Sequence, residues 1–274
     1  MSVAPPVRVR TAGAASLLLL TLLGAAPAQA RPEPLLRGRF FMTGRVTVAT
    51  HVRGERRGQM VRRGWLFASG CATAGPCRTV VLLRARAGGA DRVVLRLVGE
   101  HRYAGSGSFS VPVSCAGRRF ARGGVAPFSI VVEVVGTQAE QGVSFATAIT
   151  ASYVNPRRVN RTHCAGFIGH DAARYAGRLA TGLPAPPHAA FASTQSSPPG
   201  LSVAFADAST PAANGAPIVA RRWDFGDPGS GAADTATDPA PAHAFSAPGT
   251  YTVVLEVTDA FGLTSSTTQA ITVI

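Results

Sequence analysis

Residues 241–262 read PAHAFSAPGTYTVVLEVTDAFG, and residues 220–228, a little earlier in the chain, read ARRWDFGDP. In the first stretch, large apolar residues recur at every second position from Tyr251 to Val257, a period that is typical of a half-buried β-strand. Pro248 and Gly249 form a turn before it. In the second stretch, Trp223 and Phe225 are two residues apart, so they lie on one face of a strand and are expected to anchor a core together with Tyr251.

These residues carry a family resemblance. The WDFGD sequence, the H-x-F-x-x-x-G-T-Y segment and the T-D-x-x-G turn occur in the order found in the PKD (polycystic kidney disease) repeat family, which residues 201–274 resemble. The resemblance implies an immunoglobulin-like sandwich of about seven strands. One departure is Pro228, which stands where the family usually has glycine and leaves the conformation of the following loop open.

The aspartates of this region raise the question of a metal. Some members of the family bind calcium, and the resemblance therefore makes calcium an alternative to the simpler expectation of no cofactor. The spacing does not match a dense D-x-D-x-D calcium loop, and turn residues are the competing interpretation. The candidate ligands are Asp207, Asp224, Asp227 and Asp234.

The residues before this region also have a β-strand pattern. Apolar residues from Phe40 to Val52 alternate with arginine and threonine, and Gly or Pro clusters separate further runs of the same kind. The only candidate for an amphipathic helix is 171–179, and the glycine-rich residues 105–108 are expected to form a hairpin loop. The sequence predicts an all-β protein whose N-terminal domain is an antiparallel barrel or a sandwich. The expected strands are 40–52, 65–67, 79–86, 92–98, 108–113, 128–135 and 143–154.

The first thirty residues have the pattern of an export signal. Arg8 and Arg10 precede an apolar run from Ala14 to Ala26, and the small residues Ala28 and Ala30 indicate a cleavage site. The run is shorter than the roughly 20 residues of a spanning helix. We therefore expect a secreted, extracellular protein without a membrane span, divided into residues 1–30 (signal), 31–183 (basic β domain), 184–200 (Pro-rich linker and first edge) and 201–274 (PKD-like sandwich).

The four cysteines lie in the basic domain, and export favours their oxidation. Four cysteines allow three pairings, of which we expect Cys71 with Cys77 and Cys115 with Cys164. The alternative is a zinc site formed by Cys164 with His163 and His170, although the spacing matches no paired zinc motif.

Charge divides the chain in two. All 27 basic residues of the 274-residue chain are arginine, which excludes Walker phosphate loops, kinases and Schiff-base enzymes, because each needs a lysine. Residues 31–183 carry 23 arginines against seven acidic residues, whereas residues 184–274 carry two against seven. A surface that contacts an anionic polymer is one interpretation, and a solvated face is the other. The candidate contacts are Arg56, Arg57, Arg62, Arg63, Arg84 and Arg86.

No common catalytic motif occurs in the chain, and we expect no enzymatic activity. The leading hypothesis is a non-catalytic extracellular binding or spacer protein. Its PKD-like module would contact proteins or polysaccharides, as the family resemblance implies, and its basic domain would contact anionic polymers rather than nucleic acid. The alternatives are a small-molecule carrier with a cavity inside a β-barrel and an accessory or unrecognised hydrolase.

Overall fold

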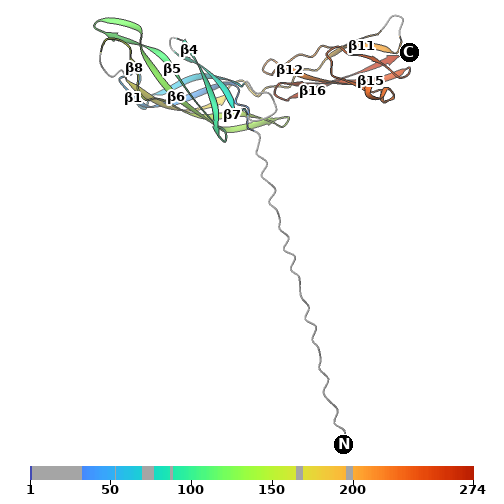
Figure 1. The fold of residues 1–274 in the computed structure, drawn as a ribbon, viewed down its shortest axis with the longest axis horizontal. Helices are drawn as coiled ribbons and strands as arrows, with labels where there is room; N and C mark the ends of the chain where they lie inside the picture. Colours follow the sequence, from blue (N-terminus) through green and yellow to red (C-terminus); the bar gives the residue numbers. More distant parts are fainter. Residues whose placement is uncertain (2–32, 53, 70–76, 87–88, 165–168, 196–199) are drawn as a thin grey trace. The chain divides into compact units, whose positions relative to one another are not determined.

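The computed structural model describes residue 1 and residues 33–274 except 53, 70–76, 87–88, 165–168 and 196–199. The predicted export signal and Cys71 lie outside the described residues. The regular secondary structure of the described residues is almost all β, as the sequence predicts (Figure 1).

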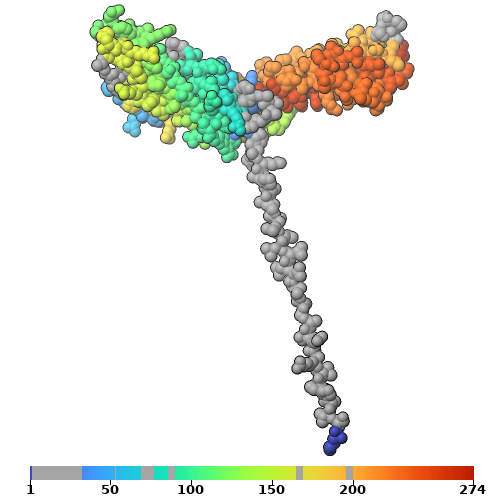
Figure 2. Space-filling model, in the orientation of Figure 1, coloured from blue at the N-terminus to red at the C-terminus, as the bar shows by residue number. Residues whose placement is uncertain are grey.

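Residues 38–179 form a closed antiparallel barrel, the first of the two architectures predicted for the basic domain. Neighbouring strands follow one another in the sequence, and pairing of β5 with β6 and of β1 with β9 completes the ring. The residues of this domain form one continuous body in the space-filling view, from blue through green to yellow (Figure 2). The barrel strands are β1 (Gly38–Thr50), β2 (Met60–Ser69), β3 (Thr79–Arg86), β4 (Gly89–Gly99), β5 (Arg102–Cys115), β6 (Arg118–Glu140), β7 (Val143–Asn155) and β9 (His170–Leu179), and the short β8 (Val159–Asn160) pairs with β6.

Inward side chains fill part of the barrel interior. Phe40, Trp65, Phe67, Leu82 and Ile130 are each at most 1% exposed. Burying a side chain of this kind stabilises a fold by about 1.5–3 kcal/mol, so these residues are the main source of the barrel's stability.

The candidate helix at 171–179 does not form, because these residues belong to β9. Strand β9 has partners on both sides, β1 and β7, and closes the ring. Its inward positions tolerate only small residues in places: a Cβ on Gly177 would lie 2.1 Å from the sulfur of Met42. Pairing with strands on both sides therefore outweighs the weak helical periodicity of these residues.

The prediction of a hairpin loop over 105–108 is also wrong, because these residues lie inside β5. A Cβ on Gly105 would lie 2.4 Å from the carbonyl oxygen of Val94, and one on Gly107 would lie 2.7 Å from the ring of Phe128. These glycines let a neighbouring strand and an aromatic ring approach the backbone closely, rather than forming a turn.

The C-terminal domain is a sandwich of two antiparallel sheets, as the resemblance implies. One sheet has the order β10-β11-β14 and the other β13-β12-β15-β16. The elements are β10 (Phe191–Gln195), β11 (Ser202–Asp207), β12 (Ile218–Asp224), the 3-10 helix η1 (Pro228–Asp234), β13 (Thr235–Ala236), β14 (Ala242–Ala244), β15 (Gly249–Asp259) and β16 (Thr264–Val273). Strand β10 falls within the segment 184–200, and η1 is the loop that follows the unusual Pro228.

The aromatic core of the sandwich contains the residues expected from the sequence. Trp223 and Phe225 are buried with their rings stacked at 6.3 Å, and the ring of Phe205 lies 5.7 and 5.3 Å from them. Tyr251 is half-buried at the edge of this core, against Phe245. Its hydroxyl donates a hydrogen bond to the carbonyl of Ala247.

Candidate functional site

Two features of the barrel are candidates for function, an outward surface and a cavity. The surface, which we call the arginine face, lies on the adjacent strands β2, β1 and β9. Because outward and inward side chains alternate along a strand, the register of these strands sets which residues are neighbours on it. The arginine face consists of Arg39, Arg45, Arg62, Arg174 and Arg178.

Like charges lie directly opposite one another on this face. Arg45 on β1 pairs in register with Arg174 on β9, and both side chains are exposed. Such a cross-strand pair is unfavourable by itself. Strands β1 and β2 contain no acidic residue, and the one acid of β9, Asp171, is buried, so no carboxylate of these three strands relieves the repulsion. A bound anion would relieve it.

Large apolar side chains are interleaved with these arginines. Phe41 is 66% exposed and Met60 is 55% exposed, and both lie in the outward rows that contain Arg45 and Arg178. The face therefore offers guanidinium groups next to an aromatic ring, a combination that suits a ligand with both anionic and apolar surface.

The predicted polymer contacts do not form one surface. Arg56 and Arg57 are exposed in the loop between β1 and β2, and Arg62 belongs to the arginine face, whereas the side chain of Arg86 is not among those described. Arg84 points into the barrel, and Arg63 lines the same cavity. Sequence reasoning missed Arg39, Arg45, Arg174 and Arg178, although the alternation of β1 already places its two arginines on the outward side.

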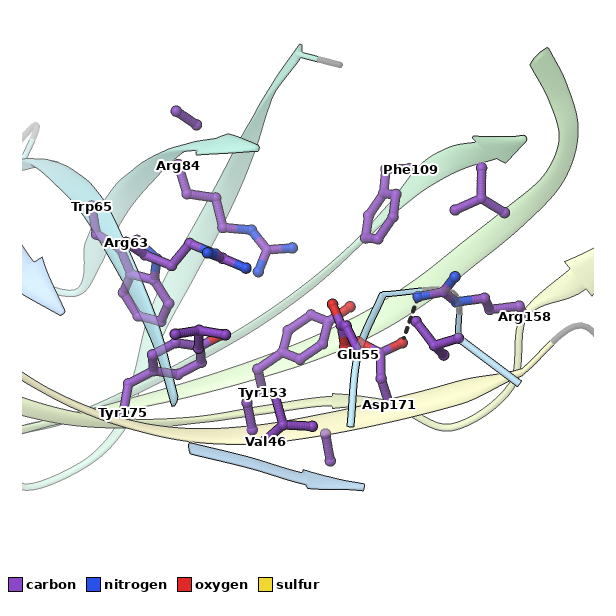
Figure 3. A pocket seen from close by; sticks show the side chains of 16 residues that line it. Val46, Glu55, Arg63, Trp65, Arg84, Phe109, Tyr153, Arg158, Asp171 and Tyr175 are labelled. Atoms are coloured by element: carbon purple, nitrogen blue, oxygen red, sulfur yellow. Dashed lines mark hydrogen bonds and ion pairs between the residues drawn. The ribbon is translucent and has the colours of Figure 1, made fainter. Parts of the chain in front are cut away.

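The cavity, which we call the barrel-mouth pocket, lies at one end of the barrel and has a volume of about 310 Å³ (Figure 3). Its aromatic walls are Trp65 and Tyr175, whose ring centroids are 5.1 Å apart, together with Phe109 and Tyr153. Ligand sites commonly occur in barrel mouths and have volumes of about 300–1,000 Å³. The pocket lies at the lower end of that range.

Two ion pairs are built into the interior around this pocket. Nε and a terminal nitrogen of Arg84 both lie 3.0 Å from Oδ2 of Asp91, and the Arg84 guanidinium lies 4.2 Å above the ring of Phe128. Arg158 contacts Oδ1 of Asp171 at 2.9 Å. Buried charges are tolerated when they are paired in this way.

Some buried polar groups beside the Arg158–Asp171 pair have no hydrogen-bond partner among the described residues. Asn155, which pairs in register with Asp171, is fully buried, and within that part of the chain neither atom of its side-chain amide has a hydrogen bond. The Nε of Arg158 is likewise buried without an acceptor from the described residues. Since buried polar groups are normally satisfied, this end of the barrel has unused hydrogen-bonding capacity.

Glu55 and Arg63 supply the remaining charges of the pocket. Within the described part of the chain, the Glu55 carboxylate has no hydrogen bond or ion pair, and burial followed by the charge of Asp171 raises its pKa, against Arg158 and Arg63. Arg63 donates a hydrogen bond to the backbone carbonyl of Arg62 at 3.0 Å. Burial raises the pKa of Tyr175, and its surroundings include Arg63, Arg84, Glu55 and Asp171. These four charged side chains are therefore all close enough to the pocket to affect Tyr175 electrostatically.

The oxidation state of the cysteines argues against the zinc alternative. Cys115 and Cys164 form a disulfide with a Cα–Cα distance of 5.8 Å, as the sequence predicts. His163 Nε2 lies 3.5 Å from the sulfur of Cys115, but an oxidised sulfur is not the thiolate that zinc needs. Cys77 is buried and is not a free thiol, while its expected partner, Cys71, lies outside the described residues.

The four aspartates proposed for calcium each already have protein partners. Asp207 contacts Arg221 and the backbone of Ser209, Asp224 accepts from Gly226 N, and Asp234 accepts from Asp227 N at 2.6 Å. Asp227 accepts from His243 at 3.1 Å and from Ser246 N at 2.8 Å. Hydrogen bonds from Ser246 and His243 outweigh burial and lower its pKa. Each carboxylate thus has a local structural role.

Among the residues that the structure describes, no helix has the length and apolar character to cross a membrane.

Comparisons with known proteins concern the C-terminal domain. Residues 184–273 match the family model of the PKD domain. The solved PKD1 domain of Vibrio anguillarum Epp is 31% identical, with 33% of this chain and 96% of that one covered and a TM-score of 0.29. The PKD1 domain from Vibrio cholerae metalloprotease PrtV is 32% identical, with coverages of 32% and 98% and a TM-score of 0.28. No curated protein matches the chain. The C-terminal third of the chain therefore belongs to the PKD domain family.

Proposed function

We propose that this chain is a secreted, non-catalytic binding protein whose barrel contacts anionic extracellular polymers and whose PKD domain contacts proteins or polysaccharides. The observation that carries the proposal is the arginine face. Five exposed arginines lie on three adjacent strands with no exposed acid among them, and two of the arginines lie directly opposite one another.

The chemistry of guanidinium groups favours carboxylated or sulfated polymers as ligands. A guanidinium group makes paired hydrogen bonds to carboxylate and sulfate oxygens, and an extended polyanion would cover several arginines at once. Phe41 adds an apolar ring against which a sugar face would pack. An anionic polysaccharide has both features, and Phe41 is 66% exposed and open to such a contact.

The test is retention of the full chain on heparin, a sulfated polysaccharide, and on neutral dextran at low and high salt. We expect retention on heparin only. High salt should release the chain, because it screens electrostatic attraction beyond a Debye length of about 8 Å or less. A variant with Arg39, Arg45, Arg174 and Arg178 changed to Gln should elute at much lower salt.

The matched control removes the same number of charges elsewhere on the barrel, by changing Arg92, Arg96, Arg118 and Arg119 to Gln. These arginines are also exposed but lie on strands β4 and β6. If both variants elute at the same salt concentration, retention depends on net charge alone and the arginine face is not a site.

A further inference from the structure

Among the described residues, the barrel-mouth pocket contains one anion and one cation that have no charged hydrogen-bond partner. Arg84 is neutralised by Asp91 and Arg158 by Asp171, so these four residues form a fixed frame without any ligand. Within the described chain, Glu55 and Arg63 line the same cavity without a charged hydrogen-bond partner. A ligand that satisfies both would carry an anionic group and a cationic group.

The walls of the pocket define the apolar part of such a ligand. Trp65 and Tyr175 form one aromatic surface, and Phe109 and Tyr153 line the cavity as well. Figure 3 shows the side chains of Arg63 and Arg84 directed into the space above Tyr175, with Glu55 close to Tyr153 and to the Arg158–Asp171 pair. A flat apolar group fits between aromatic walls in an offset or edge-to-face arrangement.

The volume limits the ligand to a small molecule. About 310 Å³ accommodates a single ring with a short polar side arm, but not a polymer. The pocket is thus distinct from the arginine face, although Arg62 and Arg63 are neighbours in the sequence.

We propose that the barrel-mouth pocket binds a small aromatic zwitterion of the amino-acid type, with its carboxylate at Arg63, its ammonium group at Glu55 and its ring against Trp65 and Tyr175. This site does not depend on polymer binding, so either property can fail without the other.

Binding can be followed by the fluorescence emission of Trp65, because this side chain lines the pocket. The chain has two tryptophans, and the second, Trp223, is buried in the PKD domain. Three probes without indole emission separate the contributions: phenylalanine has both charges, 3-phenylpropionate only the carboxylate and phenethylamine only the ammonium group. We expect phenylalanine to change the emission of Trp65 at lower concentration than either of the others.

Two substitutions assign the charged groups. Glu55→Gln should weaken binding of phenylalanine and phenethylamine by about tenfold or more, as expected for the loss of a charged hydrogen bond, and leave 3-phenylpropionate unchanged. Arg63→Gln should weaken phenylalanine and 3-phenylpropionate to a similar degree and leave phenethylamine unchanged. Thermal unfolding of each variant would verify that the barrel is folded.

Arg62→Gln is the matched control, because it removes the same charge from the adjacent residue on the outward side. The proposal is overturned if none of the probes changes the emission at millimolar concentration. It is also overturned if Arg62→Gln weakens binding as much as Arg63→Gln does, or if Glu55→Gln leaves phenylalanine binding unchanged. Loss of heparin retention with intact phenylalanine binding would contradict the polymer proposal alone.

Discussion

Gly44 determines where one wall of the barrel-mouth pocket lies. It pairs in register with Tyr175, and a Cβ at this position would lie 2.3 Å from Cδ1 of the tyrosine ring. The ring therefore occupies the space that a side chain would take, and it is held between the backbone of β1 and the indole of Trp65. A glycine inside a strand here has a packing role rather than a turn role.

Gly44→Ala should displace the Tyr175 ring and reduce binding of phenylalanine in the pocket. Overpacking of this kind costs about 1–3 kcal/mol of unfolding free energy, which urea denaturation would measure. The control is Gly64→Ala on β2, where a new Cβ meets no atom within 4 Å. Equal stability of the two variants would show that Tyr175 has room to move.

At the scale of elements, strand pairing set the conformation of segments whose sequence periodicity was ambiguous. The strong alternation of β1 and β15 identified these strands from the sequence, because each has one buried and one exposed face. Strand β9 and the glycines of β5 were misread, since their conformation depends on partners that are distant in sequence: Met42 and Tyr175 across β1 and β9, Phe128 across β5 and β6. A cavity inside the barrel was one of the alternatives, but the residues that line it were not identified, because its charges come from separate strands and loops.

The Cys115–Cys164 disulfide ties the end of β5 to the segment before β9. It closes a separation of 49 residues, for which the chain-entropy estimate is about 4 kcal/mol. Changing both cysteines to serine should lower the unfolding free energy of the barrel by up to this amount and leave the transition of the PKD domain, reported by Trp223, unchanged. A barrel transition at the same urea concentration would contradict the estimate.

Over the whole molecule, the two domains should respond to acid in opposite ways. In the PKD domain, burial of Asp207 and Asp227 is outweighed by hydrogen bonds, from Ser209 and Arg221 and from Ser246 and His243 respectively, and the pKa of each carboxyl is lowered. Because the folded state binds the proton more weakly than the unfolded state, these carboxyls stabilise the domain above the ordinary carboxyl pKa. That stabilisation is lost as the pH falls toward the lowered pKa. In the barrel, the pKa of Glu55 is raised, so its ionised form costs stability that is recovered as the pH falls through that raised pKa.

We therefore expect acidification from neutral pH to destabilise the PKD domain only below about pH 4, near the ordinary aspartate pKa. Between neutral pH and that point, acidification should raise the unfolding free energy of the barrel, because protonation of Glu55 removes the cost of its buried charge. Urea denaturation at a series of pH values, followed by Trp223 in a Trp65→Phe chain and by Trp65 in a Trp223→Phe chain, separates the domains. Glu55→Gln should reduce the gain in the barrel, to which Glu33 contributes as well because burial also raises its pKa, and Asp227→Asn should reduce the loss in the PKD domain, to which Asp207 also contributes. Unchanged pH profiles in these variants would contradict the assignment to these carboxyls.

The pairing of β1 with β9 brings together the two points at which the chain enters and leaves the barrel. Phe40 lies opposite Leu179, and Ala180 N donates to the carbonyl of Arg39 at 2.8 Å. The ring is closed, so no strand between these points needs a partner from another part of the protein. The two ends of the barrel are thus adjacent, a geometry that suits insertion into a surface loop of a host protein through two joins at a single place.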